Sequence, residues 1–134
     1  MKGFLAMLIK IQFESQIPIY KQLKNQIIEG IAAGELKPGE SMPSVRKMAE
    51  DIGINLHTVN KTYKILKNEG ILSTHRRKKV VVNSLDQMHD SDFIYKVKDH
   101  IRPIIAKSIC KGIDQEQFNQ IASQIYNEIN NGDS

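Results

Sequence analysis

The sequence has no tryptophan, a single cysteine and no long apolar run. Only 6% of its 134 residues are aromatic, which argues against a large aromatic ligand pocket. Cys110 has no partner for an internal disulfide, and this fits a reducing compartment. The apolar run 4–9 is short for a secretory signal, and it ends at Lys10 without a cleavage-like site. No segment reaches the roughly 20 residues that cross a bilayer, so we expect a cytoplasmic protein that has no membrane partner.

Patterns typical of enzymes and metal sites are also missing. The sequence contains no glycine-rich phosphate cradle and no paired catalytic carboxylates, and Cys110 has no histidine close to it along the chain. His89, Asp92 and His100 could share one side of a helix and bind a metal. One close pair and a distant histidine form a weak set, however, and solvated helix residues explain them better. We therefore predict a protein that is not an enzyme and has no metal and no cofactor.

Charge is distributed unevenly along a chain whose net charge is +4. Residues 1–83 contain 14 Lys+Arg and 7 Asp+Glu, whereas residues 84–134 contain 5 and 8. A basic first part favours a polyanionic partner, and an acidic second part suggests a different role. The alternative is a solvated surface whose charge asymmetry has no function.

Turn and cap signals divide the first part into three helices and a hairpin. Pro18 is suited to a first helical turn, and Ser44 and Asn55 are good N-caps for two short helices separated by Gly53. Two short strands then flank the basic stretch "HRRKK". The predicted helices cover residues 18–33, 45–52 and 56–68, and the predicted strands cover residues 71–74 and 80–82. A helix-turn-helix followed by a hairpin predicts a winged helix in residues 1–83.

Residues 84–134 predict two amphipathic helices. Ser84 with Gln87, and Asp114 with Gln117, have the spacing of capping boxes. Pro103 lies inside the first of these helices and should kink it or leave one backbone hydrogen bond unmade. The expected fold class is therefore mainly α with a small β-hairpin wing, followed by a two-helix unit.

Two amphipathic helices cannot bury both apolar stripes against each other and remain stable alone. A second subunit can supply the missing partner, so we predict a homodimer held by these helices, with the winged domains outside. The alternative is that the helices fold back on the winged helix of the same chain. The predicted dimerisation residues are Ile94, Val97, Ile101, Ile104, Phe118, Ile121, Ile125 and Ile129.

The helix 56–68 carries a polar stripe without any carboxylate. On a helical wheel His57, Asn60, Lys61 and Lys64 share one side, and the opposite side is formed by Val59, Thr62, Tyr63 and Leu66. Amides and cations are the groups that contact base edges and phosphates in the major groove, which admits an α-helix. Any surface helix also has a polar face with lysines, so this stripe needs support from its neighbours.

Two neighbouring features supply that support. Arg46 lies in the first turn of its helix, where a cation opposes the helix dipole unless an anion docks there. Four consecutive cations, Arg76 to Lys79, repel one another unless something negative lies between them. Together, the stripe, Arg46 and the basic hairpin predict double-stranded DNA as the partner.

The stretch "PIYKQLKNQIIEGIAAGELKPGESMPSVRKMAEDIGINLHTVNKTYKILKNEGIL" resembles the winged-helix domain of the GntR family of bacterial transcription regulators, over roughly residues 17–82. "PGESMPSVR" followed by "TVNKTY" is a specific combination. The resemblance implies a dimeric regulator whose arginine of "PSVR" and recognition-helix N-terminus touch DNA. The positions carried over from the family are Arg46, Asn55, His57, Thr58 and Asn60.

Two departures from the family pattern stand out. Leu56 occupies a position where some members have a cationic DNA contact, and cations replace the usual glycines near the wing tip. The second departure suggests more phosphate contact by the wing and less close approach of its backbone to the minor groove. The full set of predicted DNA-binding residues is Ser44, Arg46, Asn55, His57, Thr58, Asn60, Lys61, Lys64, Arg76, Arg77 and Lys78.

The short region after the wing resembles the YtrA subfamily, whose members are often linked to transporter operons. The resemblance implies a repressor that binds an inverted-repeat operator as a homodimer; no effector can be assigned from the sequence. The alternative is a winged helix used for protein or RNA contact without operator recognition. RNA readers usually display stacking aromatic residues, and the polar stripe of helix 56–68 has none.

Overall fold

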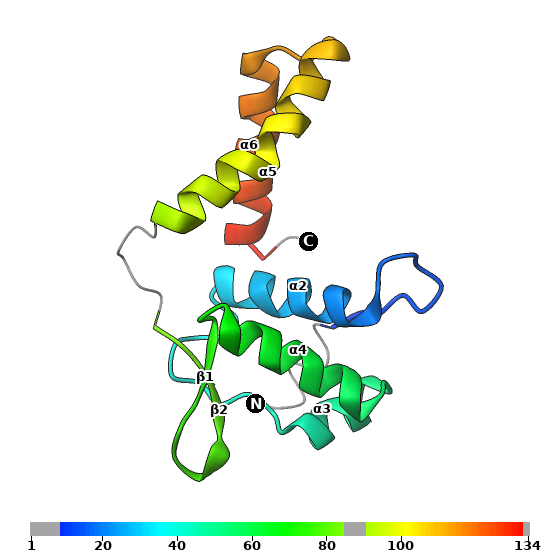
Figure 1. Cartoon of the computed structure of the whole chain (residues 1–134), viewed down its shortest axis with the longest axis vertical. Coiled ribbons are helices and arrows are strands. Elements are labelled where there is room, and N and C mark those ends of the chain that lie inside the picture. Colours follow the sequence, from blue (N-terminus) through cyan, green and yellow to red (C-terminus); the bar gives the residue numbers. More distant parts are fainter. Residues whose placement is uncertain (1–8, 85–90, 133–134) are drawn as a thin grey trace. The chain divides into compact units, whose positions relative to one another are not determined.

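The computed structural model describes residues 9–84 and 91–132, apart from the side chain of Lys78. The chain divides into two compact units, Met1–Ser84 and Leu85–Ser134. Figure 1 shows the elements of each unit. The first unit contains α2 (Ile19–Ala32), α3 (Val45–Ile52), α4 (Leu56–Asn68), β1 (Leu72–Thr74), the short 3₁₀ turn η1 (Arg76–Lys78) and β2 (Val80–Val82), and the second contains α5 (Ser91–Cys110) and α6 (Gln115–Asn130). The predicted mainly helical fold with a two-stranded hairpin is confirmed.

The helix ends in the first unit form where the cap residues predict them. The Ser44 hydroxyl accepts a hydrogen bond from the Lys47 N–H at 3.1 Å, and the side-chain Oδ1 of Asn55 accepts one from the His57 N–H at 2.7 Å. Between these helices Gly53 has a φ of 79°, in the left-handed region that glycine tolerates best. The helix-turn-helix therefore rests on local hydrogen bonds and one glycine turn.

The core of the first unit lies where α2, α3 and β1 pack against α4. Leu23 and Ile27 of α2 and Val59 and Leu66 of α4 have no exposed side-chain surface, and Leu72 of β1 is almost as buried. Burying a side chain of this size contributes about 1.5–3 kcal/mol. These contacts hold α4 by its apolar face and leave its other face at the surface.

The wing is anchored by a connector that the sequence does not identify as a pairing segment. β1 and β2 pair antiparallel, with Leu72 opposite Val82. Residues 39–42 also bond to β2, through Gly39 N–H to Val82 O at 2.8 Å and Met42 N–H to Val80 O at 2.7 Å. The hairpin projects away from the three helices in Figure 1, and this added pairing fixes the base from which it projects.

The segment before α2 is held by side chains of that helix. Residues 1–8 lie outside the described residues, and residues 9–12 form no strand. Instead, glutamine side chains of α2 bond to the backbone of this segment: Gln26 to the N–H and C=O of Lys10 at 2.7 and 2.8 Å, and Gln22 to those of Gln12 at 2.9 and 3.1 Å. Two side-chain amides spaced one helical turn apart thus satisfy an extended backbone that has no neighbouring strand.

The second unit has two helices but no buried side chain among its described residues. The predicted capping box of α6 is confirmed, because Asp114 and Gln117 exchange two hydrogen bonds, each of 2.9 Å. Gln87 of the other expected box lies outside the described residues. α5 continues through Pro103, which has no N–H to donate to the preceding turn. α5 and α6 make few contacts with each other.

Candidate nucleic-acid interface

The exposed face of α4 is the surface that the helical wheel predicts. The structure buries Val59, Thr62, Tyr63 and Leu66, which are the four residues assigned to the inner side. The predicted DNA-binding residues that lie exposed are Ser44, Arg46, Asn55, His57, Asn60, Lys61, Lys64, Arg76 and Arg77. Thr58 is half-buried, and the side chain of Lys78 is not described. The packing of α4 therefore presents amides, an imidazole and ammonium groups together to the solvent.

The first turn of α4 already uses part of its polar chemistry. The Asn55 side-chain oxygen caps the helix by accepting from the His57 N–H, which leaves its Nδ2 amino group to donate to an external acceptor. The backbone N–H groups of a first helical turn also carry the positive end of the helix dipole. This end of α4 therefore favours an electron-rich partner such as a phosphate or a purine acceptor edge.

Two adjacent cations at the start of α3 have different surroundings. The Lys47 ammonium lies 2.9 Å from an Asp51 carboxylate oxygen, and this hydrogen bond raises the pKa of Lys47. Arg46 is exposed, and no carboxylate of the described residues lies within ion-pair distance of it. Arg46 is thus the cation of this turn that remains available to an outside anion.

Lys61 is held on the protein surface rather than extended from it. Its Nζ lies 3.9 Å from the centre of the Tyr20 ring, which is a cation–π contact. Tyr20 belongs to α2 and is half-buried. Lys61 must leave this ring, or reach past it, before its ammonium group can contact a phosphate. Lys64, one turn further along α4, has no such contact with a ring of the described residues.

Tyr63 joins α4 to the beginning of α3. Its hydroxyl donates a 2.8 Å hydrogen bond to the carbonyl oxygen of Pro43, and Pro43 directly precedes the N-cap Ser44. The ring is 1% exposed, and burial raises the pKa of Tyr63, so the hydroxyl remains a donor. This contact fixes the chain three residues before Arg46 against α4. Sequence reasoning placed Tyr63 only in the core; the available signal was that a buried tyrosine hydroxyl needs a partner.

The wing tip turns without a glycine. Arg77 has a φ of 64° and a ψ of 24°, and among the described residues it is the one non-glycine with a positive φ. The His75 N–H donates to the Lys79 carbonyl at 2.7 Å and closes the loop. A left-handed backbone costs about 1–2 kcal/mol for a residue with a Cβ. The wing therefore keeps a strained arginine where glycine would fit without strain.

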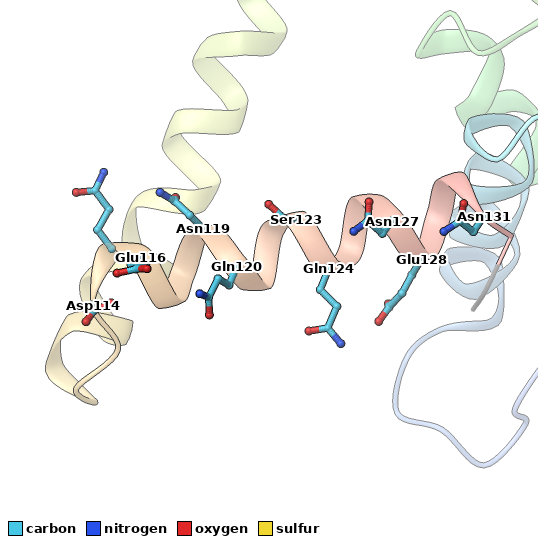
Figure 2. Close-up of a pocket in the computed structure, with 10 residues that line it drawn as sticks. Asp114, Glu116, Asn119, Gln120, Ser123, Gln124, Asn127, Glu128 and Asn131 are labelled. Atoms are coloured by element: carbon cyan, nitrogen blue, oxygen red, sulfur yellow. The ribbon is translucent and has the colours of Figure 1, made fainter.

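The described residues offer little for small-molecule or metal chemistry. They contain no group of three or more His, Cys, Asp or Glu placed to hold a metal ion, and His89 of the weak metal set lies outside them. A broad hollow runs along α6, and its lining residues, such as Gln120, Gln124 and Asn127 in Figure 2, come from this helix and its two caps. A surface with one wall does not enclose a ligand as typical small-molecule pockets do. None of the described helices is long and apolar enough to span a bilayer.

Comparisons with known proteins identify the family of this chain. The model of "Bacterial regulatory proteins, gntR family" matches residues 19–82. The HTH-type transcriptional repressor YtrA of Bacillus subtilis (strain 168) is 30% identical over 127 residues, which is 93% of this chain and 97% of that protein. The structure of YtrA from Sulfolobus acidocaldarius, described as a GntR-family transcription factor, has 41% identity and a TM-score of 0.62, and the match covers 77% of this chain and 98% of that one.

A third relative is a solved structure that matches both units of the chain. It is a crystal structure described as a transcriptional antiterminator from Listeria monocytogenes EGD-e, with 28% identity and a TM-score of 0.82, and the match covers 93% of this chain and 94% of that chain. The chain belongs to the GntR family and is a transcription regulator of the YtrA type with a winged-helix DNA-binding domain.

Proposed function

We propose that this protein is a transcriptional repressor that binds an inverted-repeat operator in duplex DNA as a homodimer. The observation that carries the proposal is the exposed face of α4, which presents amides and cations and is flanked by Arg46 and by the wing cations. The B. subtilis relative is named a transcriptional repressor, and this name supports repression over activation. The YtrA resemblance favours a transporter operon as the regulated unit.

The interface divides into groups that read bases and groups that hold phosphates. Asn55, His57, Thr58 and Asn60 lie at the N-terminal part of α4, the part of a recognition helix that contacts base edges. Cationic side chains anchor the protein on the backbone instead. The predicted phosphate contacts are Lys61, Lys64, Arg76, Arg77 and Lys78, and Ser44 and Arg46 complete the interface from the start of α3.

The second unit supports assembly through a second copy of the chain. Ile104 of α5 is 56% exposed and Ile125 of α6 is 49% exposed, although both belong to predicted inward stripes. Ile94, Val97 and Ile121 are also exposed, and Ile101, Phe118 and Ile129 are half-buried. Two helices without a buried side chain do not form a stable unit alone. A two-fold partner that offers the same helices would cover both stripes and place two recognition helices on one duplex.

Binding-site selection with the full chain tests the proposed function. The protein is mixed with a randomised duplex DNA pool, bound duplexes are enriched, and affinity for the enriched sequence is measured by fluorescence anisotropy. We expect an inverted repeat, and an affinity that falls steeply with salt because phosphate contacts release counterions. Failure to enrich any sequence, or equal affinity for RNA of the same sequence, would overturn operator recognition.

Arg46→Ala tests the interface itself, with Lys47→Ala as its matched control. We expect Arg46→Ala to weaken binding to the enriched duplex by about 1–3 kcal/mol, the range for a good base or phosphate contact. Lys47 already pairs with Asp51, so its loss should have a smaller effect on DNA affinity. Equal losses in the two variants, with both proteins folded, would mean that Arg46 supplies only general positive charge.

A further inference from the structure

Leu56 is an apolar side chain in the first turn of the recognition helix. It is 40% exposed, and α4 begins at this residue. The other large apolar residues that are exposed in the described part of the first unit, Phe13 and Ile17, precede α2. Leu56 is therefore the exposed large apolar residue at the N-terminal edge of the face proposed to meet DNA. Single exposed leucines are common on protein surfaces, so its position has to carry the argument.

Leu56 lies at the end of α4 that is proposed to meet the base edges. Side chains on an α-helix lean toward the N-terminus, and the N-terminal end of a recognition helix meets the base edges. The neighbours of Leu56 in sequence are Asn55 and His57. The side-chain oxygen of Asn55 caps the helix by accepting a hydrogen bond from the His57 N–H. This capped turn holds the backbone of Leu56 in one conformation. Leu56 is thus a fixed apolar group among polar groups that read bases.

The major groove contains one apolar group that a leucine can recognise. Thymine carries a 5-methyl group there, whereas the other three bases offer donors and acceptors that an isobutyl group cannot satisfy. We propose that Leu56 determines specificity by packing against a thymine methyl group in each half-site. This inference rests on the proposed function, because it requires operator binding through α4. A cation at the same position would instead select a base with acceptors, so Leu56 changes which base is preferred.

Deoxyuridine substitution isolates this contact, because deoxyuridine differs from thymidine only by the 5-methyl group. The probe is the duplex enriched by selection with the full chain, in which each thymine of one half-site is replaced singly by deoxyuridine. We expect one position to weaken binding by about fourfold, which corresponds to the roughly 0.8 kcal/mol gained by burying one methyl group. Leu56→Ala should bind the thymine duplex more weakly and should lose the discrimination between the two bases.

The two arms separate failure of the inference from failure of the proposed function. If no duplex is enriched, the proposed function itself fails. If a duplex is enriched but every deoxyuridine version binds the wild-type chain equally well, or if Leu56→Ala retains the same ratio of affinities, Leu56 does not read a thymine. Lys67→Ala, at an exposed position near the end of α4, is the control and should leave the ratio unchanged. Thermal melting of each variant confirms that it is folded.

Discussion

At the residue scale, the Tyr63 hydroxyl joins the core to the segment that leads to Arg46. The hydrogen bond from the Tyr63 hydroxyl to the Pro43 carbonyl oxygen is buried. If the hydroxyl is removed, water cannot replace it as the donor to this oxygen. Removing the hydroxyl leaves the ring in place and changes only this bond. We therefore propose that Tyr63 positions Arg46, which lies three residues after Pro43 in the chain.

We expect Tyr63→Phe to lower the free energy of unfolding by about 1–3 kcal/mol, the cost of leaving a buried polar group unsatisfied. Urea denaturation measures the loss, and Tyr126→Phe is the matched control because Tyr126 is 70% exposed. Burial raises the pKa of Tyr63 in the folded state, so the folded protein should lose stability as pH rises above about 10, where an unfolded tyrosine ionises. This loss of stability at high pH should be smaller in Tyr63→Phe. Equal stability of the two variants at neutral pH would contradict this role.

At the element scale, the wing combines strain with charge. Arg77 holds a backbone conformation suited to glycine, and its side chain is exposed at the tip of a hairpin whose base is fixed by residues 39–42. Strain that persists in a folded protein is compensated elsewhere or serves a function. Here the proposed benefit is an additional cation near phosphates.

Arg77→Gly should separate these two effects. The folded protein should gain about 1 kcal/mol because glycine accepts a positive φ, while the slope of log affinity against log salt should fall by about one unit for one lost phosphate contact. Arg76→Gly is the control: it also removes one cation, but at a position without a positive φ. A variant Arg77→Gly that is no more stable than Arg76→Gly would show that the strain at Arg77 is negligible.

Helix starts could be predicted from the sequence, whereas hydrogen bonds between distant residues could not. Cap residues act on neighbours three residues away or fewer, so Ser44, Asn55 and Asp114 predict helix starts that the structure contains. The hydrogen bonds between Gln22 and Gln12 and between Tyr63 and Pro43 join residues 10 and 20 positions apart. No local sequence pattern predicts them. The wing tip is a third kind of case: its missing glycine is visible in the sequence, but the residue that takes the left-handed conformation is not.

The candidate site was predictable where helical periodicity decides it. The wheel separates the buried and exposed faces of α4 correctly because α4 packs against α2, α3 and β1 on one side only. Periodicity cannot show that Lys61 rests on the Tyr20 ring or that Lys47 pairs with Asp51. These contacts depend on side-chain conformations, and they decide which cations are available to DNA.

At the scale of the whole molecule, the two units have different sources of stability. The first unit buries a continuous core drawn from its helices, its hairpin, Ile9, and Leu36 and Met42 of the connector between α2 and α3. The second unit buries no side chain among its described residues and leaves two apolar stripes uncovered. Since each fully buried aliphatic side chain contributes about 1.5–3 kcal/mol, covering these stripes by a second copy can outweigh the entropy cost of association.

Sedimentation of the full chain at micromolar concentration tests whether the protein is a dimer, because operator binding through two half-sites requires two subunits. We predict a dimer for the wild-type chain and a shift toward monomer for Ile125→Glu, which places a charge in the apolar stripe of α6. Asn127→Glu, on the polar side of the same helix (Figure 2), should remain dimeric. A monomeric wild-type chain, or a dimer that survives Ile125→Glu as well as Asn127→Glu, would contradict a homodimer held by α5 and α6.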